Sequence, residues 1–342
     1  MGDLKVTKES KISTLGGMAR LFKAEEYFNC PPWIEPEKWN DYRSKYSNAS
    51  KGNESLLQVD LELADNCNYR CLECPISDEL VGRKINKLSD EDIDLILKSS
   101  AEQGALALKI NYINEPMLDI ERLLKTAKKA YKYGFVDVYF TTNGSLLNYK
   151  NSIKLIESKL ISRIQVSLDA FTKETYNKIR RGGDFDKVNK HIQDFIELRK
   201  THNTLFPKIR VSFLTLPENK HETKLFYDHW NELVDAVALQ SSVMKPNSKR
   251  EDDTKSYDKL RTSFCPNPFR QLVVRADKSV LPCCSFWGDQ MRLGTIEDDD
   301  SLGNLFNSKM INEIRETFKN KDKKLKISCE QCLSSCDPTT DD

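Results

Sequence analysis

The sequence predicts an α/β fold in which a partial (βα)6 TIM-like barrel is followed by a small cysteine-rich α+β module. Strand-like and helix-like segments alternate between residues 57 and 240, a pattern typical of βαβ units with a parallel sheet. Six of the ten cysteines then fall between residues 265 and 336, where the composition changes. A chain of 342 residues is long enough for both parts, because such a barrel takes roughly 200–250 residues.

The first predicted strand covers residues 57–63, where apolar and polar side chains alternate at a period of two. Ser89 and Asp92 then resemble a capping box, and apolar residues at helical spacing follow them. The same criteria predict further strands at 106–113, 136–141, 164–168, 209–216 and 236–240, and helices at 120–133, 152–159, 173–179, 185–199 and 222–234. Six strand–helix units predict a barrel that is open on one side.

The composition changes along the chain indicate four regions. Residues 1–56 are polar with several prolines and aromatics, and we expect an irregular N-terminal extension that packs on the barrel through its aromatic side chains. Residues 57–244 form the predicted core domain, and the nearly all-polar residues 245–262 form a linker. Residues 263–342 form the module, with short strands at 271–275 and 279–281 and a helix at 309–319. A module with so few apolar residues needs a staple such as a metal site.

The charge balance and the apolar pattern exclude several classes of protein. With 53 basic and 52 acidic residues the chain has a net charge of +1, so nothing predicts nucleic acid or an anionic membrane as a partner. Neither a membrane-spanning apolar run nor a secretory signal is present, which predicts a cytoplasmic protein. In that reducing compartment, ten cysteines indicate metal binding or chemistry.

Three cysteines follow the first predicted strand in a C-x3-C-x2-C pattern: Cys67, Cys71 and Cys74. Three thiolates can hold three irons of a 4Fe–4S cube, which leaves the fourth iron open to another ligand. The carboxyl end of a barrel strand is also where active sites of parallel barrels lie. The alternative from spacing alone is a zinc site completed by a distant ligand.

The segment from Cys67 to Pro75, CNYRCLECP, resembles the signature of the radical S-adenosylmethionine (SAM) enzymes. The resemblance implies that a 4Fe–4S cluster binds SAM and cleaves it reductively, and that the 5′-deoxyadenosyl radical then abstracts hydrogen from a substrate. It also implies an electron donor such as flavodoxin or ferredoxin. Glu73 stands where many members carry an aromatic residue against adenine.

Later motifs resemble the rest of the SAM site in the same order along the chain. Asn114-Glu115-Pro116 is similar to the family's Gly-Gly-Glu-Pro motif, whose Glu receives the SAM ammonium. After the following strands, the chain has counterparts of four further family motifs: T-N-G, S-x-D, R-G-G and N-x-x-E. The Arg of the third motif is suited to binding the methionyl carboxylate of SAM. The alternatives are ordinary turns and helix caps. The resemblance implies a SAM-binding set of Glu115, Asn143, Ser167, Asp169, Arg181 and Asn219.

A second cysteine set comprises Cys265, Cys283 and a closing pair, Cys329 and Cys332. Four thiolates in two pairs can form a zinc ribbon or an iron–sulfur site. The surrounding sequence resembles the SPASM or twitch extension of radical SAM enzymes, which implies that these four cysteines hold one auxiliary 4Fe–4S cluster. Cys284 and Cys336 are then spare ligands or hydrogen donors. Lys278 replaces a usual turn glycine, so we expect a different hairpin turn.

The predicted substrate is a small molecule. If a fully ligated auxiliary cluster takes an electron from the substrate radical, the net reaction is a two-electron oxidation. The single-cluster pattern resembles aminocyclitol dehydrogenases, and the extension is too short and polar for the leader-binding domain of peptide maturases. We therefore expect a radical SAM oxidoreductase that acts on a sugar or aminocyclitol-like molecule. The alternatives are a peptide- or protein-modifying maturase, a radical epimerase and a zinc-binding interaction protein.

Overall fold

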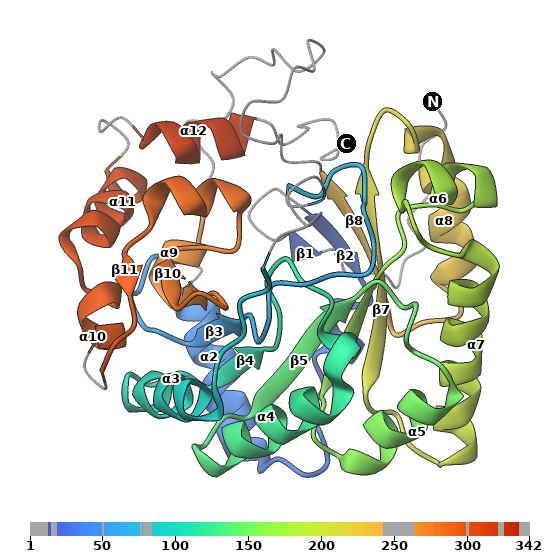
Figure 1. Ribbon diagram of the computed structural model, residues 1–342, viewed down its shortest axis with the longest axis horizontal. Coiled ribbons are helices and arrows are strands. Elements are labelled where there is room, and N and C mark those ends of the chain that lie inside the picture. Colours follow the sequence, from blue (N-terminus) through green and yellow to red (C-terminus); the bar gives the residue numbers. More distant parts are fainter. Residues whose placement is uncertain are drawn as a thin grey trace.

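The computed structural model describes residues 13–14, 19–49, 51–75, 77, 84–241, 264–298, 301–320 and 325–334 (Figure 1). Its strands form one sheet in the order β1-β2-β8-β7-β6-β5-β4-β3-β9-β10-β11. The six neighbours from β3 to β8 are parallel, which confirms the predicted partial (βα)6 barrel. They are β3 (Gln58–Leu61), β4 (Ala107–Lys109), β5 (Asp137–Thr142), β6 (Arg163–Ser167), β7 (Lys208–Thr215) and β8 (Ala236–Ser241).

Amphipathic helices cover the outside of this sheet (Figure 1). Ser89 forms the expected capping box with Asp92 at the start of the first of them. The predicted helix at 222–234 is shorter in the structure, a turn of 3-10 helix followed by α8. The elements are α3 (Asp90–Glu102), η1 (Pro116–Asp119), α4 (Ile120–Lys132), α5 (Tyr149–Ser158), α6 (Lys173–Ile179), α7 (Phe185–Thr201), η2 (Lys220–Glu222) and α8 (Thr223–Trp230).

The two faces of the strands differ in chemistry. Val59, Leu108 and Ile164 are fully buried in the main apolar core, which includes many helix residues. Because side chains alternate along a strand, the residues between them lie on the inner face of the barrel. That face is polar: Asp60 contacts Lys109, and Arg163 forms a buried ion pair with Asp137. A charged inner face provides binding groups that an apolar barrel core does not.

The N-terminal extension packs on the barrel through its aromatic side chains, as predicted, but it is more regular than expected. β1 (Ser13–Thr14) and β2 (Ala19–Phe22) continue the sheet, with β2 antiparallel to β8, and α1 (Ala24–Tyr27) and α2 (Pro36–Ala49) follow. α2 packs through Trp39 and Tyr42 against Ala107 and Val136, at the amino-terminal ends of β4 and β5. Its inner face consists of a few aromatics within a polar segment, so it lacks an aliphatic repeat to signal a helix.

The C-terminal module extends the barrel sheet. It contains α9 (Asn267–Arg270), β9 (Gln271–Val274), β10 (Ser279–Leu281), η5 (Phe286–Met291), β11 (Gly294–Thr295), α10 (Ser301–Phe306), α11 (Lys309–Lys319) and α12 (Ile327–Ser334). β9 pairs in parallel with β3, in the register Gln58 to Gln271. The predicted linker, 245–262, lies outside the described residues. The direct pairing of β9 with β3 brings the module against the first barrel strand.

The hairpin turn between β9 and β10 keeps the left-handed geometry that a glycine would adopt. Lys278 has a φ of 66°, so the expectation of a different turn was wrong. Its ammonium group forms an ion pair with Asp92 Oδ1 at 2.6 Å, which anchors the hairpin to the start of α3.

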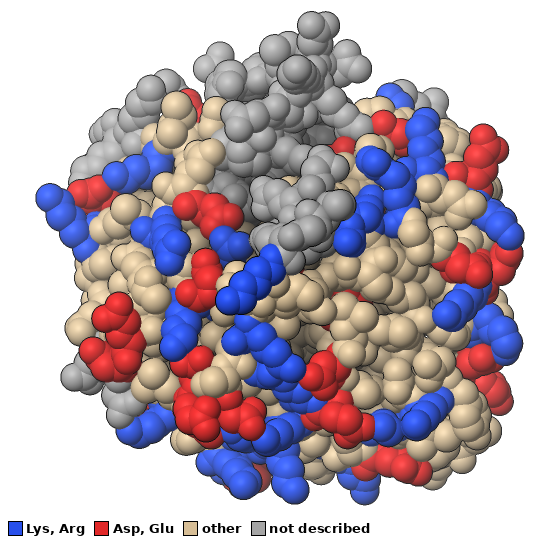
Figure 2. Space-filling view, viewed as in Figure 1, with Lys and Arg blue, Asp and Glu red and all other residues tan. Residues whose placement is uncertain are grey.

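The outer surface agrees with the balanced composition. On the face shown in Figure 2, Lys and Arg are interspersed with Asp and Glu instead of gathering by sign. Across the described residues, the helices are all too short or too polar to cross a membrane.

Glu62, just beyond β3, joins the module to the barrel. Its carboxylate accepts hydrogen bonds from Ile113 N at 3.4 Å and from Ala276 N at 3.2 Å, and Arg275 Nε lies 3.8 Å away. Burial raises the pKa of Glu62 to about 7. A buried carboxyl group that links two segments makes their association sensitive to pH.

We predict that stability falls between pH 5 and 8 because of Glu62. Its folded-state pKa lies above the unfolded value, so the contribution is full below about pH 4.5 and lost as pH rises through 7. The size is on the order of 3 kcal/mol. Urea unfolding of Glu62→Gln should show a flatter pH dependence than wild type. The exposed Glu91→Gln serves as control, and identical slopes for all three proteins would contradict the prediction.

Candidate active site

Cys67, Cys71 and Cys74 line one cavity at the carboxyl ends of the barrel strands. Their loop is held by backbone hydrogen bonds to the segment after α6, from Arg70 N to Arg181 O and from Leu72 N to Ile179 O, each at 2.8 Å. The cavity is also lined by the residues Tyr69, Glu73, Asn111, Tyr112, Ile113, Asn114, Glu115, Thr141, Thr142, Asn143, Ser167, Asp169, Ile179, Arg180, Leu214 and Leu216. The sequence motifs from separate strands therefore meet at one place.

The three thiols suit an iron–sulfur cluster. Burial raises the pKa of Cys67 to about 12, so this thiol keeps its proton in the absence of metal. A bound metal ion displaces that proton. Within the part of the chain that the structure describes, no three metal-binding side chains converge on one ion position. A 4Fe–4S cube spreads its cysteines over separate irons, so its ligands do not have to meet at one ion position.

Glu115 is buried and ties two of the motif loops together. Its carboxylate accepts hydrogen bonds from Thr142 Oγ1 at 2.8 Å, from Asn143 N at 2.7 Å and from Met117 N at 3.0 Å. Burial raises the pKa of Glu115 to about 7, and these bonds oppose that rise. Glu115 therefore also caps η1, which is the structural role that the sequence left open for this motif. A buried carboxylate at this cavity also suits a cationic ligand group.

Asn143 connects its loop to the cysteine loop. Its Nδ2 donates to Asn68 Oδ1 at 2.8 Å, and its Oδ1 accepts from Ser145 N at 2.9 Å. Asn68, between the first two cysteines, was not singled out in the sequence. Its place inside the C-x3-C segment was the available signal.

Arg180, and not Arg181, lines the cavity, which corrects the choice made within the arginine pair. Arg180 forms a buried ion pair with Asp169, and its Nη1 lies 3.6 Å from Cys71 Sγ. Arg181 is exposed and contributes its backbone carbonyl to the cysteine loop. The helix α6 ends at Ile179, so the direction of each arginine depends on the turn geometry that follows.

Two of the remaining predicted residues line the cavity, and the third holds a residue that does. Ser167 and Asp169 line the cavity, and Asp169 has a left-handed backbone with a φ of 58°. Asn219 is fully buried outside the cavity lining, and its Nδ2 donates to Asp169 O and to Leu214 O, both at 2.8 Å. The structure therefore places Asn219 as a positioning residue that holds Asp169, not as a group facing a ligand.

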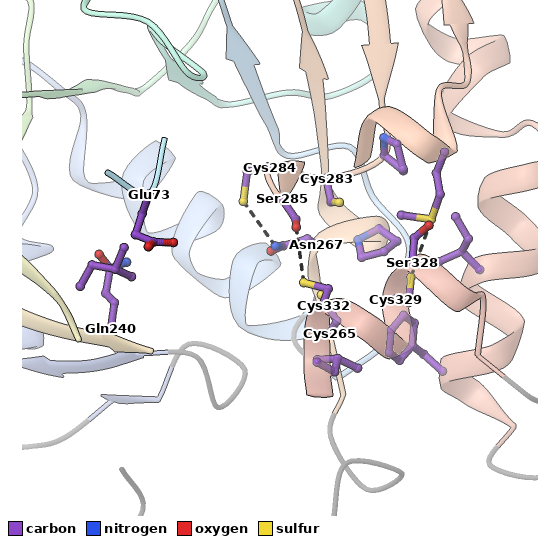
Figure 3. A pocket seen from close by; sticks show the side chains of 17 residues that line it. Glu73, Gln240, Cys265, Asn267, Cys283, Cys284, Ser285, Ser328, Cys329 and Cys332 are labelled. Atoms are coloured by element: carbon purple, nitrogen blue, oxygen red, sulfur yellow. Dashed lines mark hydrogen bonds between the residues drawn. The ribbon is translucent and has the colours of Figure 1, made fainter. Parts of the chain in front are cut away.

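A second cavity lies in the module and contains the other four predicted ligands, Cys265, Cys283, Cys329 and Cys332 (Figure 3). Burial raises the pKa of all four thiols, that of Cys329 to about 12. Four buried or half-buried cysteines from three separated segments are a donor set that fits one fully ligated cluster.

The spare cysteines have different positions. Cys284 lines the same cavity, where Asn267 Nδ2 lies 3.6 Å from its Sγ. Cys336 lies outside the described residues. Glu73 and Leu214 line both cavities, so the two sites adjoin. In Figure 3, Glu73 and Gln240 face Cys284 and Ser285 across the space between them.

The sequence of this chain matches two family profiles, the radical SAM superfamily over residues 61–214 and the iron–sulfur cluster-binding SPASM domain over residues 265–333. The chain belongs to the radical SAM superfamily. A radical SAM enzyme with a SPASM extension uses SAM and 4Fe–4S clusters, so the predicted cofactors are confirmed. The alternative interpretation of the chain as a zinc-binding interaction protein is therefore set aside.

Curated relatives include a probable GTP 3′,8-cyclase of Methanococcus maripaludis, 31% identical over 227 residues that make up 62% of this chain and 72% of the relative. The GTP 3′,8-cyclase of Lactiplantibacillus plantarum is 26% identical over 209 residues, 60% of each chain. The radical SAM chain thus spans 60–72% of these relatives' lengths.

Solved structures share the radical SAM fold. The structure of anSMEcpe with bound AdoMet aligns with a TM-score of 0.57 and 18% identity over 82% of this chain and 84% of its own. Streptococcus suis SuiB bound to S-adenosylmethionine aligns with a TM-score of 0.52 and 16% identity over 88% of this chain and 76% of its own.

The arginine pair offers a matched test of the SAM site in this radical SAM enzyme. We predict that Arg180→Met weakens SAM binding about tenfold or more, because a charged hydrogen-bonding group is lost from the cavity. Arg181→Met should change it less than twofold, since that side chain is exposed. Equilibrium dialysis of SAM against both reconstituted variants measures this. Equal losses would show that the arginines were assigned wrongly.

Proposed function

We propose that this enzyme uses a SAM-derived radical to dehydrogenate a small hydroxylated or amino-bearing molecule. The observation that supports the proposal is that Glu73 and Leu214 line both cavities, so the residues that we propose to bind SAM adjoin the four-cysteine cavity. A substrate between them would reach both sites.

The residues divide the work as follows. Cys67, Cys71 and Cys74 would hold the SAM-binding cluster, and Cys265, Cys283, Cys329 and Cys332 the auxiliary one. When bound, these groups supply the electron that cleaves SAM, the hydrogen-abstracting radical and an acceptor for the substrate's second electron. Glu115 would receive the SAM ammonium, and Arg180, held by Asp169, its carboxylate. We further propose flavodoxin or ferredoxin as the external electron donor.

Polar groups at the cavity favour a small polar substrate. Asn111 and Thr141 line the SAM cavity, and the Thr141 hydroxyl donates to Gln165 at 3.1 Å. Arg210 donates to the same Gln165 oxygen at 2.6 Å. The GTP named in the curated relatives is likewise a small hydroxylated molecule. Such groups match hydroxyl and amino substituents.

The same relatives are named cyclases, which favours a redox-neutral rearrangement as a second candidate. The two candidates differ in the mass of the product. A dehydrogenated product is lighter than its substrate by two hydrogens, whereas a rearranged product has the same mass.

Anaerobic turnover tests the proposal. The reconstituted enzyme is incubated with SAM, dithionite and candidate sugars, aminocyclitols and GTP, and mass spectrometry follows 5′-deoxyadenosine and products. We expect a product lighter by two hydrogens, and deuterium from a labelled substrate in 5′-deoxyadenosine. Release of 5′-deoxyadenosine with only products of unchanged mass would favour the rearrangement instead.

A further inference from the structure

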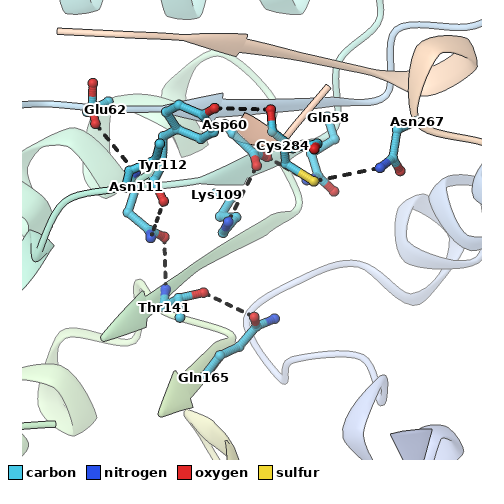
Figure 4. A network of polar contacts seen from close by, with 12 residues as sticks. Gln58, Asp60, Glu62, Lys109, Asn111, Tyr112, Thr141, Gln165, Asn267 and Cys284 are labelled. Atoms are coloured by element: carbon cyan, nitrogen blue, oxygen red, sulfur yellow. Dashed lines mark hydrogen bonds and ion pairs between the residues drawn. The ribbon is translucent and has the colours of Figure 1, made fainter. Parts of the chain in front are cut away.

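A polar cluster lies between the barrel and the module and has no part in the SAM site. It consists of Gln58 and Asp60 on β3, Lys109 on β4, Gln271 on β9 and Cys284 after β10 (Figure 4). Asp60 and Lys109 occupy paired positions on neighbouring strands, as do Gln58 and Gln271. Three strands and the segment after β10 thus bring these side chains together.

Asp60 is buried, and its partners only partly replace the hydrogen bonds that its carboxylate would make to water. Gln58 Nε2 donates to Asp60 Oδ1 at 2.6 Å, while Lys109 Nζ is 3.5 Å from Oδ2, at the long limit of a hydrogen bond. Burial raises the pKa of Asp60, and Lys109 opposes that rise. A carboxylate offers about four acceptor positions, so Asp60 retains capacity for a further donor.

Gln271 supplies an unused donor at the same place. Its side chain is 4% exposed, and its Nε2 has no partner at full hydrogen-bond geometry among the described residues. In Figure 4, Cys284 lies beside Gln58 and Asp60. A buried amide without a partner is costly, and a ligand that accepts its hydrogen bond removes that cost.

Two residues close to these side chains, Asn111 and Cys284, line the two cavities. Lys109 ends β4, and Asn111 follows two residues later in the chain. Asn111 lines the SAM cavity, and Cys284 lines the four-cysteine cavity. Figure 4 shows Asn111, Lys109, Asp60 and Cys284 in one continuous region.

We propose that Asp60, Lys109, Gln58 and Gln271 form the substrate subsite that binds neighbouring hydroxyl or amino groups of a small polyol or aminopolyol. This inference rests on the proposed function and names its substrate class. Each hydroxyl group has one donor and two acceptor positions, so neighbouring hydroxyl groups can together match a carboxylate, an ammonium group and two amides. Asp60 repels a phosphate group, and an apolar ligand group would leave the Gln271 amide and the remaining acceptor positions of Asp60 without a partner.

Binding of defined probes tests the subsite. Isothermal titration of unreduced holoenzyme with SAM present uses myo-inositol, glucosamine and GTP. We expect myo-inositol or glucosamine to bind, and Asp60→Asn to weaken that binding about tenfold or more. The matched control, Asp94→Asn, removes an equal charge from an ion pair with Lys129 on the outer helices and should change binding less than twofold.

Gln271→Met separates binding from folding. Because Gln271 Nε2 lacks a partner, this variant should be at least as stable as wild type, yet bind the probe more weakly. The proposal is overturned if neither polyol binds wild type at millimolar concentration, if GTP alone binds, or if Asp60→Asn and Gln271→Met bind like the control.

The proposed function fails in a distinguishable way. Release of 5′-deoxyadenosine from SAM and dithionite without added polyol depends on the SAM site, and the control Asp94→Asn should leave it within twofold of wild type. A wild type that binds the polyol but releases no 5′-deoxyadenosine contradicts the proposed function and leaves the subsite standing.

Discussion

A Cys71→Ala enzyme is expected to lose reductive SAM cleavage by more than about 100-fold, since loss of residues that merely support metal ligands already costs about 10–100-fold. Cys71 lines the SAM cavity, and its sulfur lies beside the Arg180 guanidinium. Without this thiolate, one iron of the proposed cluster loses its protein ligand. Anaerobic quantification of 5′-deoxyadenosine after reconstitution measures the loss.

Cys30→Ala provides the matched control for that experiment. The Cys30 thiol lies in the N-terminal extension, where it contacts the backbone oxygens of Pro31 at 3.4 Å and Ile34 at 3.5 Å. This variant should retain wild-type SAM cleavage. Substantial cleavage by Cys71→Ala would mean that another residue holds the cluster.

A Cys329→Ala enzyme is expected to lose product formation while it still releases 5′-deoxyadenosine within a few fold of wild type. Cys329 lies in the module with Cys283, Met291 and Ile314, away from the SAM-site motifs. Loss of the auxiliary cluster should lower the iron content from about eight to about four per chain. Iron analysis combined with product and 5′-deoxyadenosine assays separates the two sites.

The ligand assignment in the module is tested by Cys284→Ala. Because Cys284 contacts Asn267 and lies beside Asp60, the variant should keep its full iron content. Iron loss from Cys284→Ala equal to that from Cys329→Ala would show that Cys284 is a ligand. Loss of SAM cleavage by Cys329→Ala, with its first cluster intact, would contradict the separation of the two sites.

Much of the barrel could be predicted because strand and helix periods are local. The helices Lys173–Ile179 and Lys309–Lys319 begin and end where the sequence predicts. The pairing of β9 with β3 depends on residues some two hundred positions apart, which no local pattern encodes. α2 was missed for a related reason, because its aromatic contacts exist only after the barrel has formed.

The site could be predicted as a set of motifs, but the direction of each side chain could not. Arg180 and Arg181 are equivalent in a pattern, and only the turn after α6 brings Arg180 to Asp169. Asn219 was assigned to the ligand, yet its amide holds Asp169 and Leu214. Asp60 was not singled out because it lies in a strand of alternating polar and apolar residues. In such a strand a polar side chain ordinarily faces solvent, but here it faces the barrel interior.

The most direct test of the central claim is the yield of 5′-deoxyadenosine from the anaerobically reconstituted wild-type enzyme with SAM and dithionite. Two cysteine-held clusters predict about eight irons per chain and 5′-deoxyadenosine formation that requires both SAM and reductant. A protein with both clusters intact that releases none would contradict the assignment of Cys67, Cys71 and Cys74 as the site of SAM cleavage.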